Sequence, residues 1–223
     1  MLTSQDQHRI QQEMVDQSAD LALDEFVSDT KPWKIILLDI FDIISFLIFV
    51  TGVVLFTRFF IFNPYTIVGA SMEPTFHEND FIIVDKLTPR FWELERWDVI
   101  VFVPEGKDVP YIKRIIGMPW ETVFVKDNWF TICSGNVTSI SQTCSRLSEP
   151  YIPSDFITQA KNNKDIFYIA TGYFTVWDHR WYSTDSLSCF GLWCYGNAIY
   201  TARPQNIIGK VLVRVFPNFS TNF

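Results

Sequence analysis

One apolar segment, residues 35–56, constrains the fold of this chain more than any other feature of its sequence. Its 22 residues would extend about 33 Å as an α-helix, which matches a bilayer hydrocarbon core of roughly 30 Å. Asp39 and Asp42 interrupt the segment near its start. A bare carboxylate is costly in lipid, so both are expected at the entry interface or paired with a neighbour. The pattern predicts one transmembrane helix, an anchor of residues 34–58.

A cleavable secretory leader is the alternative interpretation of this segment. Such a leader begins with a short basic region, whereas residues 1–33 are long, polar and acidic, and no small-x-small cleavage site follows the apolar stretch. We therefore expect an uncleaved anchor preceded by a cytoplasmic lead, residues 1–33. Arg9, Lys31 and Lys34 precede the span and Arg58 follows it, a slight excess that favours a cytoplasmic N-terminus.

The amino-acid composition favours contact with lipid and argues against nucleic acid as a partner. The chain is 48% hydrophobic with 21 Phe, which is apolar for a soluble protein and fits contact with lipid. The formal net charge of −7 argues against nucleic acid as a partner, because binding its backbone requires a surplus of Lys and Arg.

Histidine and cysteine give no metal-site pattern. The three histidines are scattered and no CxxC pair occurs, so neither a metal nor an organic cofactor is expected. The four cysteines form two pairs that are close in sequence; these form disulfides if this part of the chain lies outside the cytosol, and the alternative is four separate buried thiols. The residues are His8, His77 and His179, and Cys133, Cys144, Cys189 and Cys194.

Residues 59–223 have the texture of a mostly β domain. Short apolar runs are separated by Pro, Gly, Asn and Asp, which predicts antiparallel sheets. The polar stretch 134–163 interrupts this texture and indicates an insertion with less regular structure. We place a cap insertion at about residues 121–171, within an extracytoplasmic domain.

Three segments contain residues that can do chemistry. Ser71 follows Gly69 and Ala70, so a substrate carbonyl could approach its backbone N–H, although a serine in a turn is usually only a turn residue. Lys113 has apolar neighbours on its strand, and desolvation there would lower its pKa until the neutral amine can take a proton from a serine. The more common role for such a residue is an edge-strand lysine that prevents aggregation.

The third segment, residues 176–186, is a dense polar cluster after a strand-like run. Clusters of this kind usually form turns, but these side chains could also lock one another by charge-assisted hydrogen bonds and orient a base. The residues concerned are Asp178, Arg180, Ser183 and Asp185.

In this order, the segments resemble the bacterial type I signal peptidase family over nearly the whole chain from the span onward. Four family boxes are matched in sequence: Ser-Met-x-Pro-Thr at 71–75, Arg-x-Asp-hydrophobic at 96–102, Tyr-Ile-Lys-Arg at 111–114, and the polar box at 178–186. The resemblance implies that Ser71 is the nucleophile, that Lys113 is its general base and that Ser183 orients the amine. It also implies supporting roles for Asp178, Arg180 and Asp185.

The same resemblance implies a function and a place in the cell. The chain would be a serine endopeptidase of the plasma membrane that cuts signal peptides from secreted precursors after an Ala-x-Ala-like site. The lipid bilayer is its expected surrounding and the secretion machinery a possible partner. Shallow substrate pockets would be lined by Ile67, Val68, Gly69 and Met72. The alternatives are a catalytically inactive relative that binds precursors or partners, and a self-cleaving repressor-type Ser/Lys peptidase, which the anchor and the absence of a DNA-binding front disfavour.

The sequence departs from the family pattern in ways that bear on activity. Gly69 stands where many members supply a hydroxyl as second oxyanion donor, and His179 and Leu187 replace the Asn and the terminal Arg of the last box. Trp97, Trp120 and Trp177 stand where the boxes carry Gly, and Trp129 follows Asn128 where a hairpin favours Asn-Gly.

Glycine makes up 9 of 223 residues, about 4% against a usual 7% or so. These substitutions suggest the hypothesis that some of the tryptophans are glycines in the natural protein. Their codons would have been misread as Trp, as would happen if UGA encodes Gly in the source. The alternative is a genuinely tryptophan-rich domain near the membrane.

Overall fold

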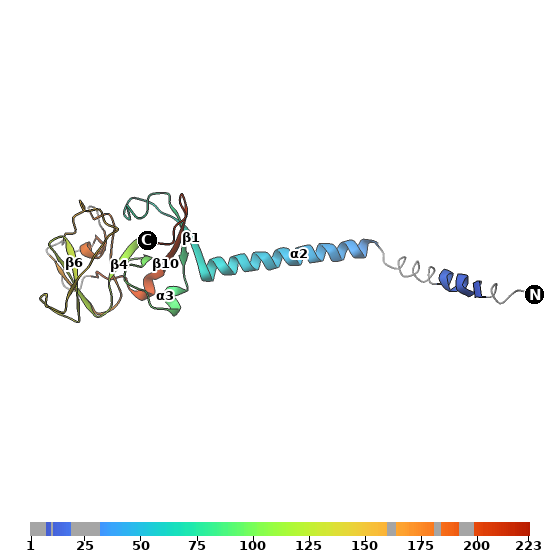
Figure 1. Ribbon diagram of the computed structural model, residues 1–223, viewed down its shortest axis with the longest axis horizontal. Helices are drawn as coiled ribbons and strands as arrows, with labels where there is room; N and C mark the ends of the chain where they lie inside the picture. Colours follow the sequence, from blue (N-terminus) through green and yellow to red (C-terminus); the bar gives the residue numbers. More distant parts are fainter. Residues whose placement is uncertain (1–7, 10, 19–31, 160–163, 181–183, 192–198) are drawn as a thin grey trace, which may run out of the picture. The chain divides into compact units, whose positions relative to one another are not determined.

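The computed structural model describes residues 8–9, 11–18, 32–159, 164–180, 184–191 and 199–223 (Figure 1). The chain divides into two compact units, Met1–Leu55 and Phe56–Phe223, which are described separately below. Within the lead, residues 8–9 and 11–18 are helical.

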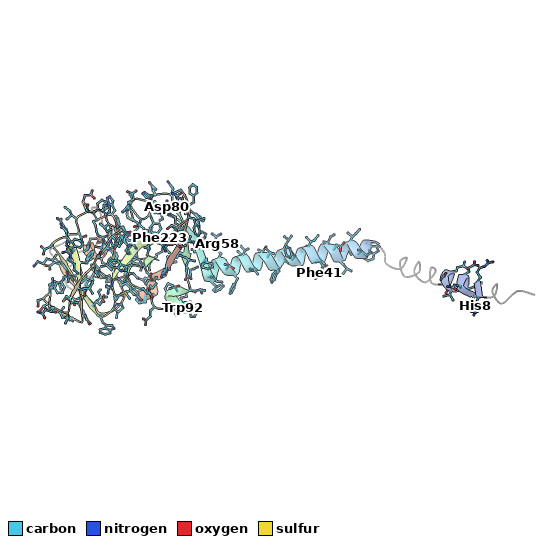
Figure 2. All side chains as sticks on the ribbon, in the orientation of Figure 1. His8, Phe41, Arg58, Asp80, Trp92 and Phe223 are labelled. Carbon is cyan, nitrogen blue, oxygen red and sulfur yellow. A yellow bond between two sulfur atoms is a disulfide. The ribbon has the colours of Figure 1, made fainter. Side chains whose placement is uncertain are left out.

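The first unit is dominated by helix α2, Pro32–Phe56. Its side chains, such as that of Phe41, stand out into the surroundings along its length (Figure 2). The apolar segment Ile35–Ile61 continues from α2 through the π-helical turn η1, Thr57–Ile61, with a mean hydropathy of 2.4 and no buried residue in its most apolar window. By length and composition this helix can cross a bilayer, and the prediction of one N-terminal apolar helix is confirmed.

The second unit contains a six-stranded sheet in which every strand pair is antiparallel. The strand order is β1-β2-β10-β3-β4-β9, so β4 lies between two neighbours. The strands are β1 Phe62–Thr66, β2 Phe81–Asp85, β3 Val99–Phe102, β4 Tyr111–Gly117, β9 Phe174–Val176 and β10 Ile207–Phe216. Short helices α3 Thr88–Phe91, η2 Ser186–Gly191 and η3 Pro204–Asn206 connect them.

Residues between β4 and β9 build a second antiparallel sheet of four strands, ordered β7-β6-β5-β8. Its strands are β5 Glu121–Lys126, β6 Trp129–Ser134, β7 Ser145–Arg146 and β8 Ile166–Ile169. Figure 1 shows β6 and β10 in different parts of the unit. A disulfide joins Cys133 of β6 to Cys144, and Cys189 is also disulfide-bonded, whereas Cys194 lies outside the described residues. The prediction of a mostly antiparallel β fold is confirmed.

An apolar cluster holds the two sheets together. Ile116 of β4 and Phe174 of β9 are fully buried against Val123, Phe130 and Phe167 of the second sheet. A second cluster under β2 contains Met72 and Phe76 from the loop that joins β1 to β2. Burying apolar area is the main favourable contribution to folding, so this loop is fixed by its own core residues.

Two of the substituted tryptophans have a backbone conformation that favours glycine. Trp97 has φ 79° and Trp120 has φ 67°, both in the left-handed region that a residue with a Cβ rarely adopts. Trp129 is different: Asp127 and Asn128 form the turn with φ 53° and 67°, and Trp129 is the first residue of β6. Backbone geometry therefore supports the glycine hypothesis at positions 97 and 120, and not at 129.

Trp120→Gly should stabilise the fold, because its side chain is 67% exposed while its backbone is strained. The expected gain in the free energy of unfolding is about 1 kcal/mol, measured by denaturant unfolding. Trp129→Gly is the matched control and should lower stability, since glycine weakens a strand. An equal loss of stability in both variants would contradict the strain at position 120. Mass spectrometry of peptides that contain positions 97 and 120, prepared from the natural source, identifies these two residues directly.

Candidate active site

Ser71 and Lys113 line one cavity of about 720 Å³. Its walls come from the chain at and after β1, from β3 and β4, and from the segment after β9. Trp177, His179 and Thr184 contribute from that last segment. Residues far apart in sequence therefore meet at a single concave surface large enough for a peptide segment.

The loop that carries Ser71 is closed by backbone hydrogen bonds at its base. Ile67 N–H donates to Asp80 O at 2.9 Å, and Asn79 N–H donates to Ile67 O at 2.9 Å. The buried Asp80 carboxylate accepts from His77 N–H and pairs with Arg214 at 3.3 Å. The start and end of the loop are thus pinned to β10, so Ser71 is presented from a supported turn.

Ser71 itself is half-buried and tied to the segment after β9. Its carbonyl accepts a hydrogen bond from His179 N–H at 3.1 Å. Within the part of the chain that the structure describes, its own amide N–H and its Oγ have no hydrogen-bond partner. Gly69 (φ 87°) lies two residues earlier on the cavity wall, and a Cβ there would meet open space. Ser71 therefore offers a hydroxyl and an amide donor to whatever enters.

Lys113 is buried in the middle of β4, only 2% exposed. Strand pairing places it opposite Ile100 of β3. Its Nζ donates to Ile112 O at 2.7 Å and lies 4.3 Å from the centre of the Trp177 ring and 5.0 Å from that of Tyr111. No hydrogen bond joins Nζ to Ser71 Oγ, although both residues are described. The amine must turn from Ile112 O to reach the serine.

Burial lowers the pKa of Lys113 from 10.5 to about 7. Loss of hydration is the largest cause, and the negative charges of Asp185 and Asp178 offset part of it. A substantial fraction of the amine is therefore neutral near pH 7, which is the form that accepts a proton.

Arg114, the next residue of β4, organises a buried polar network. Its guanidinium binds Asp178 through Nε at 2.9 Å and Nη2 at 2.6 Å, and both side chains are fully buried. Thr75 Oγ1 donates to the same carboxylate at 2.6 Å, and Arg114 Nη1 donates to Trp97 O at 3.0 Å. Burial alone would lower the pKa of Arg114, but the bonds to Asp178 raise it instead. The network joins the Ser71 loop, β4 and the segment after β9.

Arg180 makes a separate contact with the stretch between β7 and β8. It pairs with Glu149 and donates from Nε to Thr158 Oγ1 at 3.2 Å. Tyr151 OH donates to Glu149 at 2.7 Å, and its ring stacks 4.0 Å from the Arg114 guanidinium. Asp178 and Arg180 thus bind partners outside their own segment. They do not bind each other, whereas the sequence suggested that side chains of this polar cluster could lock one another.

The structure places the remaining predicted residues as follows. Ile67, Val68 and Gly69 line the cavity, whereas Met72 is fully buried in the core under β2 and does not. The carboxylate of Asp185 accepts a hydrogen bond from Leu187 N–H at 3.0 Å, and its charge raises the pKa of Lys113. Ser183 lies outside the described residues.

Several residues of the site could not be assigned from the sequence. Leu187, which replaces an arginine of the family box, packs in the apolar cluster between the sheets. The backbone N–H of His179 binds the carbonyl of Ser71, and a bond between two backbone groups cannot be inferred from residue types. Glu149 and Tyr151 come from the irregular stretch between β7 and β8, and no sequence pattern indicated them. Among the described residues, no group of three His, Cys, Asp or Glu side chains could hold a metal ion.

Trp177 occupies one side of the cavity against the lysine amine. Its backbone is not in the left-handed region, so the strain argument for glycine does not apply to it. Its Nε1 is buried without a hydrogen-bond partner in the described structure, an unfavourable arrangement for an indole. The ring therefore crowds the site without satisfying its own polar atom.

A serine on a supported turn and a buried amine with a pKa near neutrality share one cavity, an arrangement that is compatible with a serine peptidase of the lysine-base class. Comparison with known proteins agrees with this class. Residues 40–216 match the family model described as "Signal peptidase, peptidase S26". The chain therefore belongs to the signal peptidase family.

Curated relatives are similar over most of their length. The chain is 29% identical to signal peptidase I of Bacillus amyloliquefaciens over 70% of this chain and 80% of that protein. It is 33% identical to signal peptidase I V of Bacillus subtilis (strain 168) over 68% of this chain and 84% of that protein. It is 32% identical to signal peptidase I T of the same strain over 62% of this chain and 70% of that protein.

Asp178→Asn should destabilise the second unit strongly, because it leaves the buried Arg114 without its carboxylate. The expected loss in the free energy of unfolding is about 3–5 kcal/mol, measured by denaturant unfolding. Asp155→Asn, at an exposed position, is the matched control and should change stability little. Equal effects of the two substitutions would contradict the network.

Lys113→Met should stabilise the fold at pH 7 by on the order of a few kcal/mol, since each pKa unit corresponds to about 1.4 kcal/mol. The unfolded amine binds a proton below pH 10.5 and the folded one only below about 7, so wild-type stability falls as the pH drops between these values. The variant's advantage should shrink toward pH 11. Unfolding curves that show the same difference at pH 7 and pH 11 would contradict the lowered pKa.

Proposed function

We propose that this protein is a signal peptidase I that cleaves N-terminal signal peptides from secreted precursors by a Ser71/Lys113 mechanism. The observation that carries the proposal is the buried amine of Lys113, with a pKa of about 7, on the same cavity as Ser71. Membership of the signal peptidase family supports the reaction class. The enzyme is a serine endopeptidase that needs no metal or organic cofactor for these steps.

In the proposed reaction, the neutral amine of Lys113 takes the proton of Ser71 Oγ as that oxygen attacks the scissile carbonyl. The free N–H of Ser71 stabilises the oxyanion that forms. The ammonium then gives its proton to the leaving amine as the peptide bond breaks and leaves an acyl-enzyme. Lys113 next deprotonates a water molecule, which hydrolyses the ester and restores the serine. Ser183 would orient the amine during these transfers.

The residues that line the cavity are compatible with a substrate that has small apolar side chains. Ile67, Val68 and Gly69 form an apolar wall beside Ser71, and an Ala-x-Ala segment in extended conformation would place methyl groups against it. Thr184 and Tyr111 also line the cavity. The buried network of Asp178 and Arg114, the Arg180 contact and Asp185 are proposed to support the base.

The proposed setting is a membrane with the second unit outside the cytosol and residues 1–33 inside. The Cys133–Cys144 disulfide supports an oxidising compartment for this unit. Exposed apolar side chains on and after β10, including Phe216 (64% exposed) and Phe219 (75%), would contact lipid. Partners are precursor proteins, the bilayer and the secretion machinery.

Cleavage of a signal-peptide-bearing precursor by the full chain tests the mechanism. Ser71→Ala and Lys113→Met should each lose essentially all turnover, while Lys126→Gln, on the second sheet, should keep it. The wild-type kcat/KM should rise through pH 7 as Lys113 loses its proton and fall about 100-fold by pH 5, two units below that pKa. A rate that is flat down to pH 5 would contradict lysine as the base.

The second candidate is a catalytically inactive relative that binds precursors, and Trp177 favours it because the ring lies against Lys113. If the ring only obstructs a competent dyad, Trp177→Gly should raise kcat/KM by about tenfold or more, whereas Trp92→Gly, at an exposed position outside the cavity, should not. Absence of cleavage by both wild type and Trp177→Gly, with precursor still bound, would favour the inactive relative.

A further inference from the structure

A second cavity of about 600 Å³ shares no lining residue with the peptidase cavity. It lies between α3, the turn after β3 and the start of β10. Three cationic side chains line it, from Lys86, Arg90 and Lys107. In a chain whose formal net charge is −7, a concentration of positive charge in one hollow requires a specific explanation.

These three cations are not neutralised by the described part of the protein. Among the described residues, no carboxylate lies within 4 Å of any of their nitrogens. Glu105 also lines the cavity, but it pairs with Arg203 at 2.8 Å. The cavity therefore presents a net positive charge and favours an anion as its occupant.

Lys86 connects the cavity to the turn at the end of the apolar segment. Its Nζ donates to Phe59 O at 2.8 Å, and its backbone N–H donates to Ile61 O at 2.8 Å. Both acceptors belong to the last turn of the segment Ile35–Ile61. A membrane-spanning segment that ends at this turn would leave the hydrocarbon here and would bring Lys86 close to the phosphate headgroups.

Two aromatic side chains beside the cavity fit the same level. Phe91 and Trp92 follow Arg90 directly, are 71% and 64% exposed, and contact each other edge to face at 5.9 Å (Trp92 is labelled in Figure 2). Tryptophan beside exposed apolar area is typical of a membrane interface, where one side meets acyl chains and the other meets water.

We propose that Lys86, Arg90 and Lys107 bind the phosphate of one anionic phospholipid in the leaflet next to the second unit. The guanidinium of Arg90 supplies a forked pair of donors for phosphate oxygens, and the two ammonium groups supply charge. The lipid's acyl chains would extend past Phe91 and Trp92. The site would fix the depth of the second unit at the membrane surface, independently of the peptidase cavity.

Native mass spectrometry of the detergent-solubilised full chain, titrated with phosphatidylglycerol, tests this site without measuring turnover. The test variant is Arg90→Gln/Lys107→Gln, which leaves Lys86 and its bond to Phe59 O in place. Lys126→Gln, an exposed cation on β5, is the matched control. Phosphatidylcholine with the same acyl chains is the neutral lipid, and inorganic phosphate in large excess is the competing free anion.

We expect wild type and Lys126→Gln to retain phosphatidylglycerol in preference to phosphatidylcholine. The double variant should bind phosphatidylglycerol about twentyfold more weakly, because each cation near an anionic lipid surface contributes roughly fivefold. Equal retention of the two lipids by wild type, or unchanged affinity in the double variant, would overturn the proposal. Displacement of the lipid by inorganic phosphate alone would also overturn it, since the site would then be one for free phosphate.

Discussion

The buried position of Lys113 in β4 is the constraint on which the rest of the site depends. Strand β4 lies between β3 and β9, so its lysine cannot reach bulk water as an edge lysine would. Desolvation lowers the pKa of the amine to about 7, and this gives lysine the proton affinity that histidine supplies in other serine peptidases. The same burial opposes folding, because a group that is charged in the unfolded chain must lose its hydration. The surrounding architecture must offset that cost.

The offset comes from the apolar clusters. The buried Arg114–Asp178 pair, whose own desolvation is costly, contributes geometry instead. The pair joins β4 to the segment after β9, and Thr75 extends it to the Ser71 loop. Its geometry is bidentate and both groups are fully buried, so it fixes the relative positions of the strands while Asp178 partly restores the pKa of Lys113. The Asp178 carboxylate therefore supports the scaffold and, together with Asp185, raises the pKa of Lys113.

The sequence predicted what depends on local pattern and missed what depends on contacts between distant segments. The apolar segment 35–56 and the alternating runs gave the helix and the antiparallel sheets, because helix length and strand periodicity are local properties. The partners of Asp178 and Arg180 were not predictable, since Glu149 lies in an irregular insertion whose path no pattern specifies. Trp97 and Trp120 were singled out because the family boxes carry Gly at these positions, and their positive φ angles give the glycine hypothesis a structural basis. At Trp129 the turn lies one residue earlier than the sequence suggested.

The central claim is that the folded protein holds the Lys113 amine near neutrality, and a titration of that amine tests it most directly. The full chain labelled with [13Cε]lysine would be followed by NMR across pH 5–11, with Lys113→Met identifying the resonance. The account predicts a midpoint near pH 7 for this lysine, while exposed lysines titrate near 10.5. A midpoint near 10.5 for Lys113 would contradict the account.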